Sequence, residues 1–174
     1  MNTANKLTML RVALIPVFLA VLYTGFPYNH YVAIGIFIIA GITDIVDGHI
    51  ARSRGQVTDF GKLMDPLADK MLVLSAILWF VEQGTFPAWA AFVVLIREFM
   101  ITAVRMIGRG KGRTISAGTL GKVKTVVAMV VLPVMFLPLE TWMNYACIAA
   151  IILTTIISGV EYIVKNRDIM DWKT

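Results

Sequence analysis

Four aspartates near the ends of two apolar stretches have the type and spacing of metal ligands. Asp44 and Asp47 are three residues apart, and Asp65 and Asp69 are four residues apart. On a helix, residues at these spacings share a face, so each pair presents its carboxylates together. Ionised groups in or near a bilayer are costly unless a partner or a cation compensates them. Carboxylate oxygens suit Mg²⁺ or Mn²⁺, so we expect the four aspartates to form a divalent-metal site.

Small and basic residues lie beside these aspartates. Gly48, Ala51 and Arg52 fall on the helix face of Asp44, and Gly61 lies four residues before Asp65. Small residues let a backbone or a bulky ligand come close, and an arginine can bind phosphate oxygens through its planar fork. The alternative is that the aspartates are loop charges that merely flank the apolar segments, but such charges have no reason to return to one face.

A second set of charges interrupts a later apolar run. Arg97 and Glu98 lie in its middle, and Arg105 follows Arg97 by eight residues on the same face. Lys122 directly precedes another apolar run, so its ammonium group must reach an interface or an anion. Arg97, Arg105 and Lys122 together would suit an acceptor that carries its own phosphate. The alternative is a structural ion pair of Arg97 with Glu98 or Glu161.

The composition places these residues in a membrane protein. The chain has 174 residues, of which 58% are hydrophobic, and its mean hydropathy is +0.77. Soluble domains contain about 45–50% apolar residues. The net charge of +5 is compatible with nucleic acid, anionic lipid or an anionic substrate. With this hydropathy, we expect a membrane lipid partner and an anionic substrate, and no nucleic acid.

The apolar residues form runs that are long enough to cross a bilayer. A spanning helix needs about 20 mostly apolar residues, and Gly, Pro and Asn separate the runs. The expected fold is therefore an all-α membrane protein with six transmembrane helices, in one domain that covers residues 1–174. The expected spans are residues 8–25, 31–50, 63–82, 86–107, 120–138 and 142–163.

Basic residues are distributed unevenly between the gaps. The gaps 26–30, 83–85 and 139–141 contain no Lys or Arg. With six spans, the remaining gaps and both termini fall on the other side of the membrane, which the positive-inside rule makes cytoplasmic. This places the aspartates at the cytoplasmic side of a multi-pass protein in the cell membrane.

The aspartate pattern resembles the signature of the CDP-alcohol phosphotransferase family. It reads Asp44-x2-Asp47-Gly48-x2-Ala51-Arg52, then eight residues, then Gly61-x3-Asp65-x3-Asp69. The resemblance implies six transmembrane helices, a homodimer and two divalent cations held by the four aspartates. It also implies that Asp69 is the general base. The residues that it assigns to the CDP group of the donor are Gly48, Ala51, Arg52 and Gly61.

Three motifs follow the aspartates along the chain: Arg97-Glu98-Phe99, Gly121-Lys122-x-Lys124-Thr125 and Ser158-Gly-x-Glu161-Tyr162. Within this family, they resemble the motifs of bacterial phosphatidylglycerophosphate synthases. That resemblance implies transfer of a phosphatidyl group from CDP-diacylglycerol to glycerol 3-phosphate, with release of CMP. Two features depart from the pattern: Thr102-Ala-Val-Arg105, where Ser/Thr-Gly-Leu-Arg is usual, and the glycine-rich segment 108–112.

Two other functions are compatible with parts of the pattern. A sibling enzyme would use the same aspartates with inositol phosphate, phosphatidylglycerol or a small alcohol as acceptor. A metal-ion carrier would also need membrane carboxylates, but near the bilayer midplane with access from both sides. The position of the aspartates at one end of their spans favours the transferase.

Overall fold

The computed structural model describes residues 3–53, 59–110, 112 and 118–168. Within its helices, the side chains of residues 3–7, 44–53, 59–66, 69 and 109 lie outside the description. The chain divides into two compact units, one formed by Met1–Ile77 with Leu132–Pro138 and the other by Leu78–Val131 with Leu139–Thr174.

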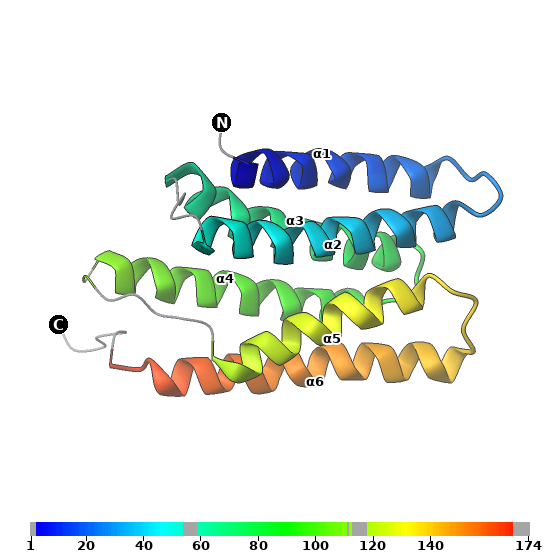
Figure 1. Ribbon diagram of the computed structural model, residues 1–174. Coiled ribbons are helices and arrows are strands. Elements are labelled where there is room, and N and C mark those ends of the chain that lie inside the picture. The colour runs from blue at the N-terminus through cyan, green and yellow to red at the C-terminus, as the bar shows by residue number, and fades with distance from the viewer. Residues whose placement is uncertain (1–2, 54–58, 111, 113–117, 169–174) are drawn as a thin grey trace. The chain divides into compact units, whose positions relative to one another are not determined.

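The described residues form α-helices, with no strand among them (Figure 1). This confirms the all-α prediction, and each expected span corresponds to one helix. Helices satisfy their own backbone hydrogen bonds, which an apolar environment requires. The helices are α1 (Thr3–Tyr23), α2 (Asn29–Ser53), α3 (Asp59–Glu82), α4 (Ala88–Gly110), α5 (Thr119–Met135) and α6 (Thr141–Lys165).

In the first unit, α1 packs along α2. Phe18 of α1 contacts the rings of Phe37 and Phe136, with centroid distances of 5.9 Å to each. The buried guanidinium of Arg11 donates from Nε to the carbonyl oxygen of Ala40 at 3.2 Å. This bond ties α1 to the turn of α2 that leads to Asp44. The aspartate pair of α2 is therefore carried by a helix that is fixed against α1.

In the second unit, α4 packs against α6, and the N-terminal part of α5 lies beside both. The turn before α4 depends on Gly84, whose φ of 70° is one that side-chain-bearing residues rarely adopt. Pro87 follows, and its carbonyl oxygen accepts the first backbone hydrogen bonds of α4, from Ala90 and Ala91. These local features fix where α4 begins.

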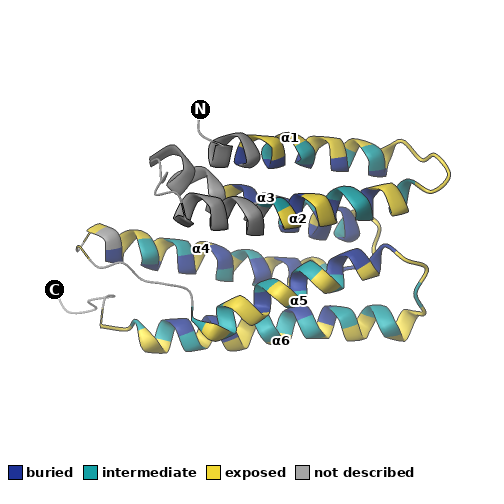
Figure 2. Ribbon diagram, in the orientation of Figure 1, coloured by how far each residue is buried: buried dark blue, intermediate teal, exposed yellow. Residues whose placement is uncertain are grey.

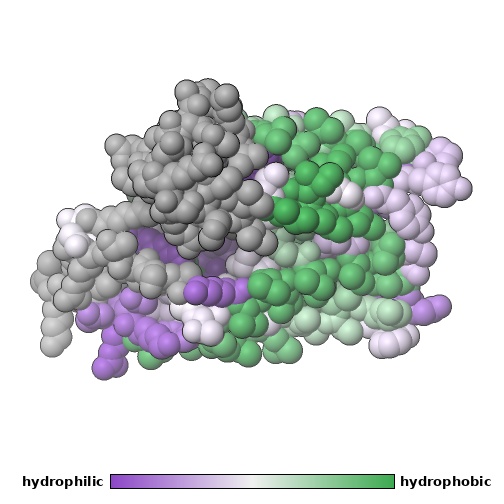
Figure 3. Space-filling view, in the orientation of Figure 1, coloured by the Kyte–Doolittle hydropathy of each residue, from purple (hydrophilic) through white to green (hydrophobic). Residues whose placement is uncertain are grey.

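Large apolar side chains cover the outside of the helices. The exposed apolar residues of α6 include Leu153, Ile156, Ile157, Val160 and Val164. Figure 2 shows exposed positions along this helix, and Figure 3 shows apolar surface over α5 and α6. Exposed apolar surface of this extent marks a membrane or partner interface. Among the described residues, one helix, Thr141–Lys165, is both long and apolar enough to cross a bilayer. With this surface, the chain has the character of a membrane protein.

Candidate active site

The signature aspartates are carried by two helices. Asp44 and Asp47 lie in the last turns of α2, and Asp65 and Asp69 lie in the first turns of α3. Because both segments are helical, the spacings of three and four residues keep each pair on one helix face. Their side chains lie outside the described part of the structure, so their convergence on one metal site stays a prediction.

The other residues assigned to the donor site fall on the same two helices. Gly48, Ala51 and Arg52 lie in α2, and Gly61 lies in α3. Their side chains also fall outside the description. The four aspartates offer a metal only carboxylate oxygens as ligands. Such ligands fit Mg²⁺ or Mn²⁺ rather than a metal that prefers sulfur or nitrogen. Among the described residues, no group of three or more His, Cys, Asp or Glu side chains could hold a metal.

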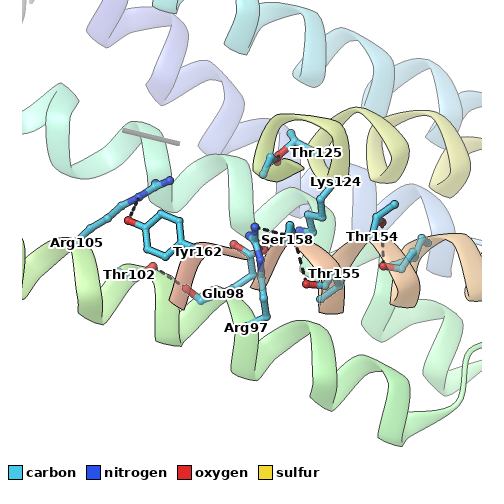
Figure 4. A network of polar contacts seen from close by, with 12 residues as sticks. Arg97, Glu98, Thr102, Arg105, Lys124, Thr125, Thr154, Thr155, Ser158 and Tyr162 are labelled. Atoms are coloured by element: carbon cyan, nitrogen blue, oxygen red, sulfur yellow. Dashed lines mark hydrogen bonds and ion pairs between the residues drawn. The ribbon is translucent and has the colours of Figure 1, made fainter. Parts of the chain in front are cut away.

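The second unit contains a polar cluster within its apolar bundle (Figure 4). Nη1 of Arg97 donates to Oε1 of Glu98 at 2.8 Å, and Nη2 donates to Oγ of Ser158 at 3.1 Å. The Arg97 and Glu98 side chains are only 13% and 10% exposed. The Arg97–Glu98 ion pair of the alternative is therefore present, whereas Glu161 pairs with Lys165. Binding of a phosphate by Arg97 stays a prediction.

The structure adds Lys124 to this cluster. Its Nζ donates to the same Oε1 of Glu98 at 2.7 Å, and its side chain is 7% exposed. Lys122, which was predicted to share a pocket with Arg97, is exposed. The two lysines lie on different sides of α5, and the buried side carries Lys124. The lysine that the structure brings to Glu98 is thus two residues after the predicted one.

The position of Lys124 follows from the glycines before it. A Cβ at Gly118 would lie 3.4 Å from Oε2 of Glu161, and a Cβ at Gly121 would lie 3.6 Å from Nη2 of Arg97. Gly118 directly precedes α5, and Gly121 and Lys124, three residues apart, share one face of the helix. At both positions the backbone thus lies within contact distance of charged side chains, Glu161 of α6 and Arg97 of α4. That periodicity is the sequence signal that could have identified Lys124.

Arg105 faces α6, about two turns further along α4 than Arg97. Its Nε donates to the hydroxyl of Tyr162 at 3.3 Å, and its guanidinium carbon lies 5.6 Å from the centre of the same ring. Ser158 and Tyr162, the partners of Arg97 and Arg105, are four residues apart on α6. The expectation that the two arginines share a face of α4 is confirmed.

The cluster carries more positive than negative charge. Arg97 and Lys124 both bind one oxygen of Glu98, so the three side chains together have a formal charge of +1. Nε of Arg97 and Oγ1 of Thr155 are buried and have no hydrogen-bond partner. A buried excess charge is unfavourable until an anion compensates it. These three side chains therefore carry the kind of charge that an anionic ligand could offset, and anion binding at the cluster stays a prediction.

A groove of about 210 Å³ runs between α4 and α6 beside the cluster. Its lining is mainly apolar, and it includes Arg97, Thr155 and Gly159. A Cβ at Gly159 would lie 3.2 Å from Cγ of Arg97. The missing side chain of Gly159 thus leaves room for the stem of Arg97 to cross α6 and place its guanidinium at Ser158.

The family model described as CDP-alcohol phosphatidyltransferase matches residues 1–157 of the chain. The chain belongs to this family. The match crosses both compact units and includes the whole aspartate signature. The family assignment makes the protein a transferase of substituted phosphate groups.

Bacterial relatives are similar over nearly the whole chain. The CDP-diacylglycerol–glycerol-3-phosphate 3-phosphatidyltransferase of Bacillus subtilis (strain 168) is 38% identical over 183 residues, covering 95% of both chains. The Escherichia coli (strain K12) protein of the same name is 34% identical, covering 98% of both chains. A probable phosphatidylglycerophosphate synthase of Mycobacterium tuberculosis (strain H37Rv) is 40% identical, covering 97% of this chain and 83% of the relative.

Proposed function

We propose that this protein is an integral-membrane enzyme that transfers a phosphatidyl group from CDP-diacylglycerol to glycerol 3-phosphate. The products are phosphatidylglycerol phosphate and CMP, so the enzyme serves phospholipid biosynthesis. The observation that carries the proposal is the near-full-length similarity to relatives of this activity from distant bacteria. The complete aspartate signature of the family supports the same reaction class.

The four aspartates serve the donor in this proposal. Asp44, Asp47, Asp65 and Asp69 would hold two Mg²⁺ or Mn²⁺ ions, which supply charge neutralisation at the pyrophosphate when bound. Asp69 takes the proton of the acceptor hydroxyl. The hydroxyl oxygen forms a bond to the phosphorus that carries diacylglycerol, the bond from that phosphorus to the CMP oxygen breaks, and CMP leaves.

The neighbouring residues of the signature bind the rest of the donor. Arg52 binds phosphate oxygens through its guanidinium fork. Gly48, Ala51 and Gly61 carry little or no side chain, so the CDP group can approach the backbone of both helices. The diacylglycerol part of the donor remains in the surrounding lipid.

The cationic residues of α4 serve the acceptor. The phosphate of glycerol 3-phosphate must lose water to enter a partly buried site, which is costly unless fixed cations replace the lost hydration. Arg97 and Arg105 both point from α4 toward α6, and the Arg97 cluster carries a net positive charge. Of the two lysines that begin α5, Lys122 is exposed and Lys124 is buried in the cluster.

The proposed topology has six spans in a single domain, with both termini and the active site at the cytoplasmic side. The gaps without Lys or Arg support this orientation, and the family match over residues 1–157 supports one domain. A homodimer is part of the proposal, because the family resemblance implies it.

The test is an assay of the purified protein in detergent or vesicles. CDP-diacylglycerol would be supplied with glycerol 3-phosphate, inositol phosphate, phosphatidylglycerol or glycerol, and CMP release would be measured with and without a chelator. We expect rapid CMP release with glycerol 3-phosphate, loss of activity on chelation and recovery with Mg²⁺ or Mn²⁺. Preference for another acceptor would indicate a sibling enzyme. Metal binding without CMP release would refute the transferase.

A further inference from the structure

Glu98 binds two cations through one oxygen atom. Its Oε1 accepts hydrogen bonds from Nη1 of Arg97 at 2.8 Å and from Nζ of Lys124 at 2.7 Å. The three side chains come from neighbouring positions of α4 and from α5, and Figure 4 shows Arg97 and Lys124 turned toward the same point. Glu98 is therefore the link between the cation of α4 and the cation of α5.

Without this carboxylate, the two cations would not stay together. Both nitrogen atoms bind one oxygen, so they are at most about 5.5 Å apart, a distance at which like charges repel strongly in a poorly hydrated interior. Glu98 offsets that repulsion and fixes both side chains. It compensates only one of the two charges, so the pair still attracts an anion.

We propose that Glu98 is a positioning residue that holds Arg97 and Lys124 as one cationic pair for the phosphate of the acceptor. Lys124, rather than Lys122, is then the lysine of the acceptor site. This inference rests on the proposed function and adds to it the residue that orders the acceptor site. Glu98 acts through the two cations and does not itself contact the acceptor.

The surroundings of Arg97 show that the guanidinium is held in place for more than an ion pair. Gly159 leaves room for its stem, and Ser158 accepts a hydrogen bond from Nη2. Nε of Arg97 is buried without a partner. An ion pair with a purely structural role would require only one cation for Glu98, and it would not leave the Nε donor of Arg97 without an acceptor.

The test compares Glu98→Gln with Glu140→Gln. Both substitutions remove one negative charge at nearly constant shape, but Glu140 is exposed before α6 and makes no side-chain capping bond. We expect Glu98→Gln to raise the KM for glycerol 3-phosphate at least tenfold while the KM for CDP-diacylglycerol stays within twofold. Glu98→Asp, which keeps the charge, should recover part of the loss. Glu140→Gln should match the wild type.

A second comparison keeps the test decisive if Glu98→Gln fails to fold. Lys124→Met and Lys122→Met make the same change two residues apart. We expect Lys124→Met to raise the acceptor KM at least ten times more than Lys122→Met. A larger effect of Lys122→Met would overturn the inference.

The outcomes separate this inference from the proposed function. If the wild type uses glycerol 3-phosphate and Glu98→Gln leaves its KM unchanged, or raises the KM of donor and acceptor equally, the positioning role is wrong and the proposed function stands. If the wild type prefers an acceptor without phosphate, both are wrong.

Discussion

The acceptor site can be tested by the substitution Gly159→Ala, which adds a single methyl group beside Arg97. In Gly159→Ala the new Cβ would lie 3.2 Å from Cγ of Arg97, which is closer than carbon atoms normally pack. The arginine stem must therefore shift. Its Nη2 bond to Ser158 is already 3.1 Å long, and such bonds weaken beyond about 3.2 Å, so a small shift is enough to disrupt it.

The size of the effect follows from two opposing contributions. Overpacking of this kind costs about 1–3 kcal/mol, whereas replacing Gly by Ala within a helix gains about 1 kcal/mol. We therefore expect little change in the thermal unfolding of the protein. We expect the strain to displace Arg97 and so to weaken its binding of the acceptor phosphate. A loss of about 1.4 kcal/mol in that binding would raise the KM for glycerol 3-phosphate about tenfold.

Two other glycines provide matched controls. At Gly121 the added Cβ would lie 3.6 Å from Nη2 of Arg97, an ordinary contact, and at Gly35 in α2 it would meet nothing within 4 Å. The KM for glycerol 3-phosphate and for CDP-diacylglycerol would be measured for all three Gly→Ala variants. An acceptor KM in Gly159→Ala no higher than in Gly35→Ala would refute the assignment of Arg97 to acceptor binding.

Three further predictions concern the proposed mechanism. In Asp69→Asn the side-chain amide cannot accept the proton of the acceptor hydroxyl, so turnover should fall by about 10²–10⁴-fold. Direct measurement should show that binding of CDP-diacylglycerol is largely kept. A near-normal rate would mean that another group is the base. Asp44→Asn removes a metal ligand, so a titration with Mg²⁺ should show a higher metal requirement and partial rescue at high concentration. Arg105→Ala should raise the KM for glycerol 3-phosphate much more than the KM for CDP-diacylglycerol. Arg105→Lys should recover the KM for glycerol 3-phosphate only in part, because an ammonium group lacks the planar fork of arginine. An unchanged KM for glycerol 3-phosphate would exclude Arg105 from the acceptor site.

Much of the fold could be predicted from the sequence because its signals are local. Apolar runs of spanning length predicted all the helices, and the turns at Gly25 and Gly84 end two of them. The shared face of Arg97 and Arg105 followed from their spacing of eight residues. The Arg97–Glu98 ion pair was foreseen only as an alternative to phosphate binding, because adjacent charges of opposite sign do not reveal which other groups they meet.

The choice between Lys122 and Lys124 required the structure. Two side chains that are two residues apart on a helix point in directions about 200° apart around the helix axis. Lys122 and Lys124 therefore cannot face the same neighbour. In a soluble helix, the apolar stripe would indicate which side is buried. On α5 that signal is missing, because apolar side chains occupy both sides: Val123, Val126 and Val130 are exposed while Ala128 and Leu132 are buried.

The rotation of α5 is set instead by where its backbone can approach its neighbours. Gly118 and Gly121 meet Glu161 and Arg97, and continuing their spacing of three residues brings Lys124 to Glu98. In a helix that is apolar on all sides, small residues rather than hydrophobic ones mark the packed face. Glu98 then determines which lysine is retained in the bundle, because a buried ammonium group needs a carboxylate. Glu98 offsets only one of the two positive charges of Arg97 and Lys124. In the proposed acceptor site, the contact that holds Lys124 in the bundle would therefore also leave the charge that attracts the phosphate.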